Sequence, residues 1–223
     1  EVERRAYADR AEHMGDPDYW DVPVRFLTDT AYAKETVQTI MPNRASLSSD
    51  IQAGNPWPYE SRETTHYSVV DKDGNAVSVT TTLNTSYGCG ILVDGAGFFL
   101  NNEMDDFSSK PGVPNIYGLV GKEANAIQPG KRPLSSMTPT IVLKENKPFM
   151  IIGSPGGSTI ITTTLQTILN VVLHEMDIKE AVSAPRVHSQ WLPDIIMTEP
   201  RGVSRDVKRN LKAMGHVVMP YKW

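Results

Sequence analysis

The sequence predicts a mixed α+β fold, and three observations carry this prediction. Two segments, 66–83, which is rich in Val and Thr, and 138–152, have the pattern of β-hairpins with polar turns near Gly74 and Asn146. Between 159 and 175, apolar residues recur at helical spacing, which predicts a well-buried helix. Shorter helical patterns lie near both ends of the chain. Hairpins flanked by helices are typical of α+β proteins.

The first 47 residues predict two helices rather than an independent domain. A charged helix over 1–12 is followed by a Gly-Asp-Pro turn, and a second helix over 28–40 has Thr28 or Asp29 as its cap. The apolar faces of both helices are thin. We therefore expect this segment to pack against another part of the protein.

The remaining elements follow in chain order. The sequence predicts a short strand over 97–100, a long ordered loop over 110–133 and a loop over most of 182–193. It also predicts a last helix over 204–214 and a strand over 216–219. In the long helix, the residues that recur at helical spacing and are expected to be buried are Ile161, Leu165, Ile168, Leu169, Val172 and Leu173.

Composition excludes several classes of protein. A net charge of −4, with no basic patch laced with aromatics, argues against a nucleic-acid binder. The single cysteine excludes an intramolecular disulfide and a Cys-rich zinc site, and the five histidines show no metal-binding spacing. We expect no cofactor and no metal. No apolar run reaches the ~18 residues of a membrane span, and residues 1–5 do not look like a secretory signal.

The stretch from Glu63 to Val70 is the place where a loose loop meets a strand. Upstream, the sequence Gly-Asn-Pro-Trp-Pro at 54–58 suits neither a helix nor a central strand. If the chain were cut before Thr64, the hydroxyl and the free α-amine of Thr64 would place a nucleophile and a base in one residue. The alternative is an ordinary strand that begins with Thr64 and Thr65, and the dipeptide alone favours that alternative.

Three further clusters have a functional interpretation and a plain structural alternative. The glycine-rich stretch 153–157, between a strand and a helix, would offer backbone N–H groups to an anion, or it is only a tight turn. The acids at 103–106 would receive an ammonium group or help to ligate a metal, or they form a solvated turn. Ser135 and Ser136 would hold a carboxylate, or they bond within their own turn.

Taken in order, these stretches resemble the motifs of the γ-glutamyltranspeptidases. The similarity extends from about Ala6 to Pro193. The motifs that carry it are Thr64-Thr65-His66-Tyr67-Ser68, Thr80-Thr81-Thr82-Leu83-Asn84, Leu100-Asn101-Asn102-Glu103-Met104-Asp105-Asp106-Phe107, Lys131-Arg132-Pro133-Leu134-Ser135-Ser136-Met137 and Gly153-Ser154-Pro155-Gly156-Gly157-Ser158. Each motif is weak alone, but five in the same order make the resemblance specific.

The resemblance implies an N-terminal-nucleophile hydrolase with a four-layer αββα sandwich. Members of this family cut themselves, which implies here a cut between Glu63 and Thr64. Residues 1–63 would then be the C-terminal end of the large subunit, and 64–223 would be the small, catalytic subunit. The implied substrates are glutathione or other γ-glutamyl compounds, with water, amino acids or peptides as acceptors, and the implied location is the periplasm or the cell exterior.

The resemblance also assigns roles to matching positions. Thr64 would be the nucleophile and Thr82 its hydrogen-bonding assistant. Backbone N–H groups of Gly156 and Gly157 would stabilise the oxyanion. The substrate α-ammonium would be received by Asn84, Glu103 and Asp106, and its α-carboxylate by Ser135 and Ser136.

Two departures from the family pattern bear on what this chain can do. The large subunit of the family is much longer than residues 1–63 and supplies a carboxylate-binding arginine without a counterpart here, and relatives continue beyond a position like Trp223. We therefore expect a chain that needs its missing parts, with apolar faces exposed. Two alternatives stay open: a related amidase, such as a β-lactam acylase or a polyglutamate-cleaving enzyme, and an unprocessed, silent protein that binds amino acids.

Overall fold

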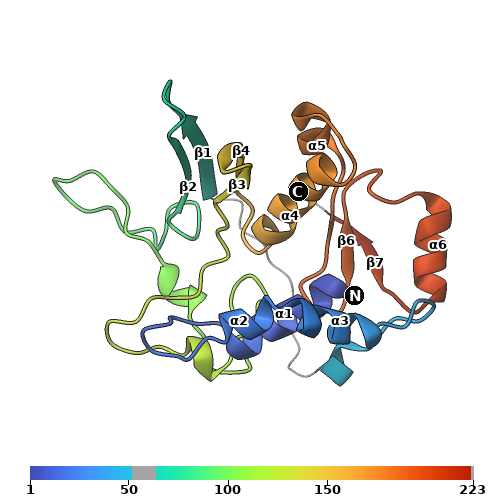
Figure 1. Cartoon of the computed structure of the whole chain (residues 1–223). Coiled ribbons are helices and arrows are strands. Elements are labelled where there is room, and N and C mark those ends of the chain that lie inside the picture. Colours follow the sequence, from blue (N-terminus) through green and yellow to red (C-terminus); the bar gives the residue numbers. More distant parts are fainter. Residues whose placement is uncertain (52–63, 222–223) are drawn as a thin grey trace. The chain divides into compact units, whose positions relative to one another are not determined.

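The computed structural model describes residues 1–51 and 64–221, which form helices, two hairpins and a small sheet (Figure 1). The loop motif at 54–58, Glu63 and Trp223 lie outside the described residues. Two compact units are present. Unit 1 comprises the described parts of Glu1–Tyr59, Met104–Leu134 and Pro185–Trp223, and unit 2 those of Glu60–Glu103 and Ser135–Ala184.

The N-terminal segment of unit 1 is helical, as predicted. Helix α1 spans Val2–His13 and helix α3 spans Thr30–Gln38, where the Asp29 side chain caps the helix by accepting a hydrogen bond from the N–H of Ala31 at 2.6 Å. Helix α3 is shorter at both ends than predicted. A four-residue helix, α2 (Val24–Leu27), was not predicted, because so short a segment has no readable period.

Residues from the C-terminal part of the chain cover the N-terminal helices in unit 1. Trp191 is 2% exposed, its indole N–H donates to the carbonyl of Ser48 at 3.2 Å, and the Ser48 hydroxyl donates back to the Trp191 carbonyl at 2.8 Å. The guanidinium of Arg4 forms an ion pair with Asp194. The prediction that residues 1–47 pack against another part of the protein is therefore confirmed.

The sheet of unit 1 has three short strands. They are β5 (Val187–His188), β6 (Ile196–Thr198) and β7 (Val218–Pro220), in the order β5-β6-β7. Strands β5 and β6 are antiparallel, and β6 and β7 are parallel. Helix α6 (Arg205–Ala213) precedes β7, and the Ser204 side chain caps it by accepting from the N–H of Val207 at 3.4 Å.

The rest of unit 1 is mostly irregular. The predicted long loop over 110–133 contains only the 3₁₀ turn η3 (Glu123–Asn125) and single β-bridges. Two further 3₁₀ turns are η1 (Ser48–Ile51) and η2 (Glu103–Asp106), and η2 spans the boundary between the two units.

Unit 2 contains the two predicted hairpins. Strands β1 (Thr64–Val70) and β2 (Ala76–Thr82) are antiparallel, as are β3 (Thr140–Lys144) and β4 (Lys147–Ile152). The hairpins form separate sheets, and side chains join them. The hydroxyl of Ser68 donates to the carbonyl of Ile151 at 3.2 Å, and that of Ser78 to Ile152 at 3.1 Å. The predicted strand over 97–100 is wrong, because that segment makes only a single bridge, Leu92 with Phe99.

Helix α4 (Thr159–Val172) is followed by α5 (Ile178–Ser183), and the predicted burial of the long helix is wrong. Its buried side chains are Thr159, Ile160, Thr162, Thr164 and Thr167. Of the residues expected to be buried, Leu165 is 43%, Val172 51% and Leu173 66% exposed, whereas Ile161, Ile168 and Leu169 are half-buried. The buried threonines keep their hydroxyls bonded, since Thr162 and Thr167 donate to helix carbonyls three or four residues back. Periodicity identified an apolar face but not whether the described chain covers it.

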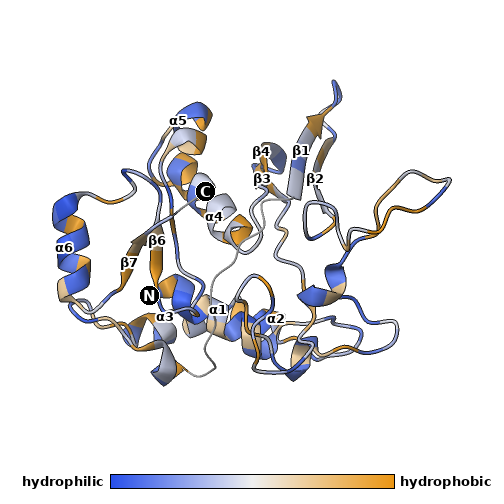
Figure 2. Cartoon of the chain, turned by 180° about the vertical axis from the view of Figure 1, so that it is seen from behind, coloured by the Kyte–Doolittle hydropathy of each residue, from blue (hydrophilic) through white to orange (hydrophobic). Residues whose placement is uncertain are grey.

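Large apolar side chains are exposed on several elements of unit 2, which confirms the expectation of exposed apolar faces. Figure 2 shows where hydrophobic residues lie along the backbone. On the hairpins, Val69 is 53%, Val77 52% and Leu143 59% exposed. Among the described residues, no helix has both the length and the apolar character to cross a membrane.

Candidate active site

Thr64 opens strand β1 and faces a second threonine on the neighbouring strand. Thr64 and Thr82 are register partners in the β1–β2 hairpin, and Thr64 Oγ1 donates a hydrogen bond to Thr82 Oγ1 at 3.3 Å. Both residues are half-buried. The β-branched side chains of this strand pair suit a pleated sheet, so the local sequence explains why the two hydroxyls meet. The structure therefore joins two of the sequence-predicted site residues directly.

The turn after Thr82 brings Asn84 into the same neighbourhood. Thr82 Oγ1 accepts a hydrogen bond from the N–H of Asn84 at 2.9 Å. Asn84 is buried with a φ of 75°, a left-handed conformation that asparagine tolerates better than most residues. Its side-chain Nδ2 donates to the carbonyl of Asn102 at 3.2 Å. Asn84 is thus held against the segment that leads directly into Glu103.

Glu103 is a half-buried carboxylic acid with a perturbed pKa. Its backbone N–H donates to the Asn101 side chain at 3.0 Å, which fixes the start of the turn. Burial removes water from the carboxyl group and raises the pKa of Glu103 above its ordinary value. A cation that bound beside this carboxyl group would restore its charged form, so the group suits recognition of an ammonium.

Asp106, the other predicted acid, lies in unit 1 and near a cation. It lines a cavity of about 20 Å³ together with Arg10 and Ser108. Burial lowers the pKa of Arg10, and the negative charge of Asp106 opposes this shift. The Ser108 hydroxyl is buried and has no hydrogen-bond partner among the described residues. A cavity of this size can hold about one water molecule.

Gly156 and Gly157 form the turn before helix α4. Both have positive φ, 129° and 55°, which glycine adopts at little cost. Their carbonyls accept hydrogen bonds from the first turn of the helix, Gly156 from the N–H of Thr159 at 3.1 Å and Gly157 from that of Ile160 at 3.3 Å. Within the described part of the chain, the N–H groups of the two glycines donate to no backbone carbonyl. The N-terminal end of helix α4 carries positive potential, and the backbone N–H groups of the two glycines are hydrogen-bond donors. Together they suit the binding of an oxyanion.

A close contact places the glycine-rich turn beside strand β1. An added Cβ at Gly153 would lie 2.3 Å from the ring of His66, so only glycine fits there. His66 is two residues after Thr64 and therefore on the same face of the strand. Its ring nitrogens bond to Thr80 Oγ1 at 2.8 Å and Ser68 Oγ at 3.1 Å, and burial lowers its pKa. His66 is thus a structural link between β1 and the turn.

Ser135 and Ser136 precede strand β3 in unit 2. Ser135 is exposed, and its Oγ accepts a hydrogen bond from the N–H of Met137 at 3.0 Å, which is a bond within its own turn. The Ser135 hydroxyl can still donate its own hydrogen. Upstream, the Arg132 side chain and backbone N–H bind the buried carboxylate of Asp16 in unit 1, the N–H at 2.9 Å. This ion pair anchors the loop that ends before the serines.

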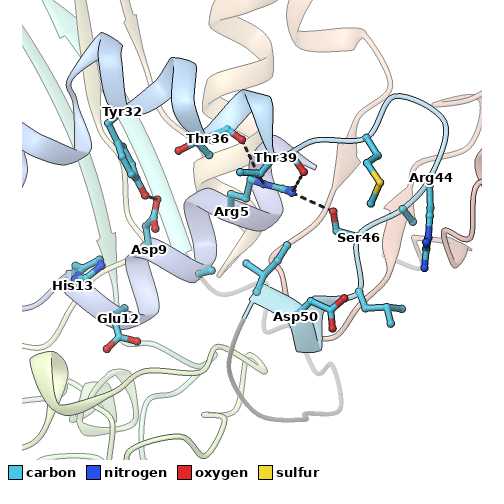
Figure 3. Close-up of a pocket in the computed structure, with 15 residues that line it drawn as sticks. Arg5, Asp9, Glu12, His13, Tyr32, Thr36, Thr39, Arg44, Ser46 and Asp50 are labelled. Carbon is cyan, nitrogen blue, oxygen red and sulfur yellow. Dashed lines mark hydrogen bonds between the residues drawn. The ribbon is translucent and has the colours of Figure 1, made fainter.

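Unit 1 contains a pocket of about 640 Å³ beside α1 and α3, and none of the residues that line it is a predicted site residue (Figure 3). Its polar side chains bond to one another: Tyr32 donates to Asp9 at 2.8 Å, and Arg5 donates to Thr39 at 2.7 Å and to Ser46 at 3.1 Å. The described residues contain no cluster of three or more His, Cys, Asp or Glu that could hold a metal ion.

Sequence comparison matches the whole chain. The family model described as Gamma-glutamyltranspeptidase matches residues 1–223. The glutathione hydrolase proenzyme of Escherichia coli (strain K12) is 56% identical over 218 residues, which are 98% of this chain and 37% of that protein. The proenzyme of the same name from Pseudomonas sp. (strain A14) is 52% identical, over 96% of this chain and 37% of that protein. The chain thus spans little more than a third of the length of these relatives.

Solved structures support the same assignment. A mutant of Helicobacter pylori γ-glutamyltranspeptidase is 64% identical with a TM-score of 0.69, over 70% of this chain and 84% of that chain. A cephalosporin acylase from Bacillus halodurans has a TM-score of 0.76 over 99% of this chain and 37% of that chain, but at 24% identity this likeness concerns the fold alone. The fold is therefore the predicted one, an N-terminal-nucleophile hydrolase fold of which this chain carries a part. On the full-length family match and these identities, the chain belongs to the γ-glutamyltranspeptidase family.

Proposed function

We propose that the protein containing this chain cleaves the γ-glutamyl amide of glutathione and related compounds, and transfers the γ-glutamyl group to water, an amino acid or a peptide. The observation that carries the proposal is the hydroxyl pair at the head of β1, where Thr64 Oγ1 lies 3.3 Å from Thr82 Oγ1. Relatives that are 56% and 52% identical bear the name glutathione hydrolase proenzyme, which supports this substrate class.

The proposal includes a cut between Glu63 and Thr64, which divides the chain into 1–63 and 64–223. The word proenzyme in the names of the relatives supports a processed enzyme. The matched Helicobacter pylori chain corresponds to 70% of this chain, a share close to that of the part from Thr64 onward. After the cut, Thr64 carries a free α-amine with an ordinary pKa of about 8, so the amine is a usable base near neutral pH.

The reaction then proceeds in two balanced steps. Thr64 Oγ1 attacks the γ-carbonyl carbon, and its proton passes to the Thr64 α-amine while Thr82 holds the hydroxyl in place. The backbone N–H groups of Gly156 and Gly157 stabilise the oxyanion. The amine of the leaving group takes the proton as the C–N bond breaks, which leaves a γ-glutamyl ester on Thr64. Water or an acceptor amine attacks this ester and regenerates the hydroxyl.

Recognition of the donor rests on its two charges. The α-ammonium is received by Asn84, Glu103 and Asp106, which offer one amide and two carboxylates. The α-carboxylate is received by Ser135 and Ser136. Meeting both charges with fixed partners selects a γ-glutamyl group over an acyl group that lacks them. This chemistry favours the γ-glutamyl donor over the acyl groups of a related amidase.

The partners follow from the same proposal. Residues 1–63 act as the end of a larger subunit, whose remainder completes the enzyme and covers apolar surface left exposed here. The periplasm or the cell exterior is proposed as the location from the family resemblance.

The test uses the full-length proenzyme and its Thr64→Ala variant. We expect intact mass and N-terminal sequencing of the parent to show a new chain that begins at Thr64, together with release of nitroaniline from γ-glutamyl-p-nitroanilide. The variant should stay a single chain and release none, because it lacks the nucleophile for both steps.

Two other outcomes would overturn the proposal. An uncut parent without turnover would support the silent amino-acid-binding protein. A cut parent that ignores the γ-glutamyl anilide but hydrolyses another amide would support the related amidase.

A further inference from the structure

Asn102 is a half-buried residue of unit 2 to which the family motifs assign no role. It lies directly before Glu103, and it bonds to all three residues of the segment 83–85, which follows strand β2. Asn84, in the middle of that segment, and Glu103 are both proposed to receive the substrate α-ammonium. One residue thus connects two members of the same proposed subsite, and all of these residues lie in unit 2.

The backbone and the side chain of Asn102 share this connection. The N–H of Asn102 donates to the carbonyl of Leu83 at 3.2 Å, and its carbonyl accepts from Asn84 Nδ2 at 3.2 Å. The side-chain Oδ1 accepts from the N–H of Thr85 at 3.2 Å and from the Thr85 hydroxyl at 3.1 Å. The bonds to Thr85 are therefore those that a substitution of Asn102 removes.

The segment 83–85 needs such an anchor because Asn84 has an unfavourable backbone conformation. A φ of 75° is uncommon for any residue other than glycine, and it persists only where the surrounding structure fixes it. Asn102 holds the neighbours of Asn84 on both sides. Close packing continues beyond the segment, since an added Cβ at Gly88 would lie 1.9 Å from the carbonyl oxygen of Leu100.

The same contacts orient the side chain of Asn84. Its Nδ2 is bound to the carbonyl of Asn102, whose peptide bond leads into Glu103. Oδ1 is the only side-chain atom of Asn84 that accepts a hydrogen bond from an ammonium, and its position is set with that of Nδ2 because the amide is planar. A displacement of segment 83–85 would therefore move this acceptor relative to the peptide that carries Glu103.

We propose that Asn102 is a positioning residue for the substrate α-ammonium, whose side chain holds segment 83–85 in place so that the Asn84 amide stays against the peptide leading into Glu103. The inference rests on the proposed function, in which Asn84 and Glu103 receive the ammonium. An ammonium group donates three hydrogen bonds in fixed directions, so the acceptors that share it must keep their separation.

The test measures recognition of the ammonium apart from the chemical steps. L-Glutamate and glutarate, which differ only in the α-ammonium, are compared as competitive inhibitors of nitroaniline release from γ-glutamyl-p-nitroanilide. Each inhibition constant reports binding alone, so a change in the rate of attack by Thr64 does not affect it. The full-length processed enzyme is assayed as parent, Asn102→Ala, Asn102→Asp and Thr85→Val.

We expect Asn102→Ala to weaken L-glutamate by about tenfold and glutarate by less than about twofold, because the lost hydrogen bonds hold only the ammonium partners. Asn102→Asp keeps a side-chain oxygen that accepts from Thr85, so its preference for L-glutamate should be no lower than that of the parent. Thr85→Val keeps the shape of the side chain but loses the hydroxyl, and should lower the preference by about threefold. It remains informative if the Ala variant fails to fold.

The matched control is Asn170→Ala. Asn170 is also half-buried in unit 2, and its Nδ2 donates to the carbonyl of Ala181 at 3.4 Å, which joins α4 to α5. This substitution removes a bridging side-chain bond that involves none of the proposed site residues. The preference should therefore equal that of the parent, even where thermal stability falls.

Equal weakening of both inhibitors in Asn102→Ala, or an unchanged preference in Thr85→Val, would overturn the positioning role while the proposed function stands. A loss of preference in Asn102→Asp as large as in the Ala variant would overturn it as well. A parent that releases no nitroaniline from the γ-glutamyl anilide would overturn the proposed function, and this inference with it.

Discussion

At the scale of single residues, two ionisable side chains of unit 1 have pKa values that burial shifts away from their ordinary range. Glu3 accepts a hydrogen bond from the N–H of Ser189 at 3.0 Å, and burial raises its pKa to about 7. Burial lowers the pKa of His188 to about 4, and its Nε2 bonds to the Gln190 side chain at 2.9 Å. Glu3 lies on α1, and the His188 ring packs edge-on against Tyr7 of α1 at 6.0 Å between ring centroids, so both residues join α1 to the C-terminal part of unit 1 and their titration affects stability.

Glu3→Gln should make the protein more stable, and the gain should grow with pH. The raised pKa means that the folded state favours the neutral carboxyl. The contribution of Glu3 to the free energy of unfolding is therefore fully present below the ordinary pKa of about 4.5. It is lost as pH rises through the folded-state pKa of about 7. Glutamine stays neutral, so thermal unfolding of the full-length variant should match the parent near pH 4 and show a gain of about 3 kcal/mol near pH 8.

Glu35→Gln, which removes an exposed carboxylate on α3, is the control for that comparison and should show no such growth. A gain for Glu3→Gln of the same size at both pH values would contradict a titration origin.

At the scale of elements, the junction of β4 and α4 depends on a glycine whose role is steric. The ring of His66 occupies the space where a side chain at Gly153 would begin, and the hydroxyls of Thr80 and Ser68 hold that ring. Because the glycine-rich turn follows directly, this contact ties the proposed oxyanion donors to the strand that starts with Thr64.

Gly153→Ala should therefore weaken both stability and turnover. The added methyl group must displace the His66 ring, at a cost of about 1–3 kcal/mol. In the double variant with His66→Ala, the methyl group has room, so stability should fall by less than the sum of the two single losses. Unfolding curves and nitroaniline release for the four proteins check this. Strict additivity would show that the two positions do not touch.

At the scale of the whole molecule, unit 1 contains contacts between residues that precede the proposed cleavage site and residues that follow it. Residues before position 63 bond to residues from the last forty of the chain, as Ser48 does with Trp191 and Ala45 with the carbonyl of Met214 at 2.7 Å. Buried side chains and hydrogen bonds between the two pieces are the contacts by which a protein interface holds two chains together, so we expect the pieces to stay associated after the backbone is cut.

The two pieces should co-elute from a sizing column after processing and separate only in denaturant. Trp191→Ala should lower the urea concentration at which they separate, because it removes a side chain that is 2% exposed and costs about 3–5 kcal/mol. Trp20→Ala is the matched control, since Trp20 is 38% exposed. Equal effects of the two substitutions would show that the Trp191 contact does not hold the pieces together.

Local sequence predicted the hairpins, Asp29 as one of two candidate caps and the glycine-rich turn, because propensity and turn chemistry act over a few neighbouring residues. It also pointed to Thr64 and Thr82, whose register follows from the length of one hairpin. The roles assigned to the substrate-binding residues remain predictions from the family motifs.

Only the tertiary structure decided which face of α4 is buried and which distant segment Asn102 joins. Helical periodicity shows that one face of a helix is apolar, but burial depends on which other elements pack against that face. In α4 the buried face consists mostly of threonines. The partners of Asn102 are seventeen to nineteen residues before it, beyond an irregular loop without a period to read. Such contacts arise from packing in three dimensions, which short-range patterns do not encode.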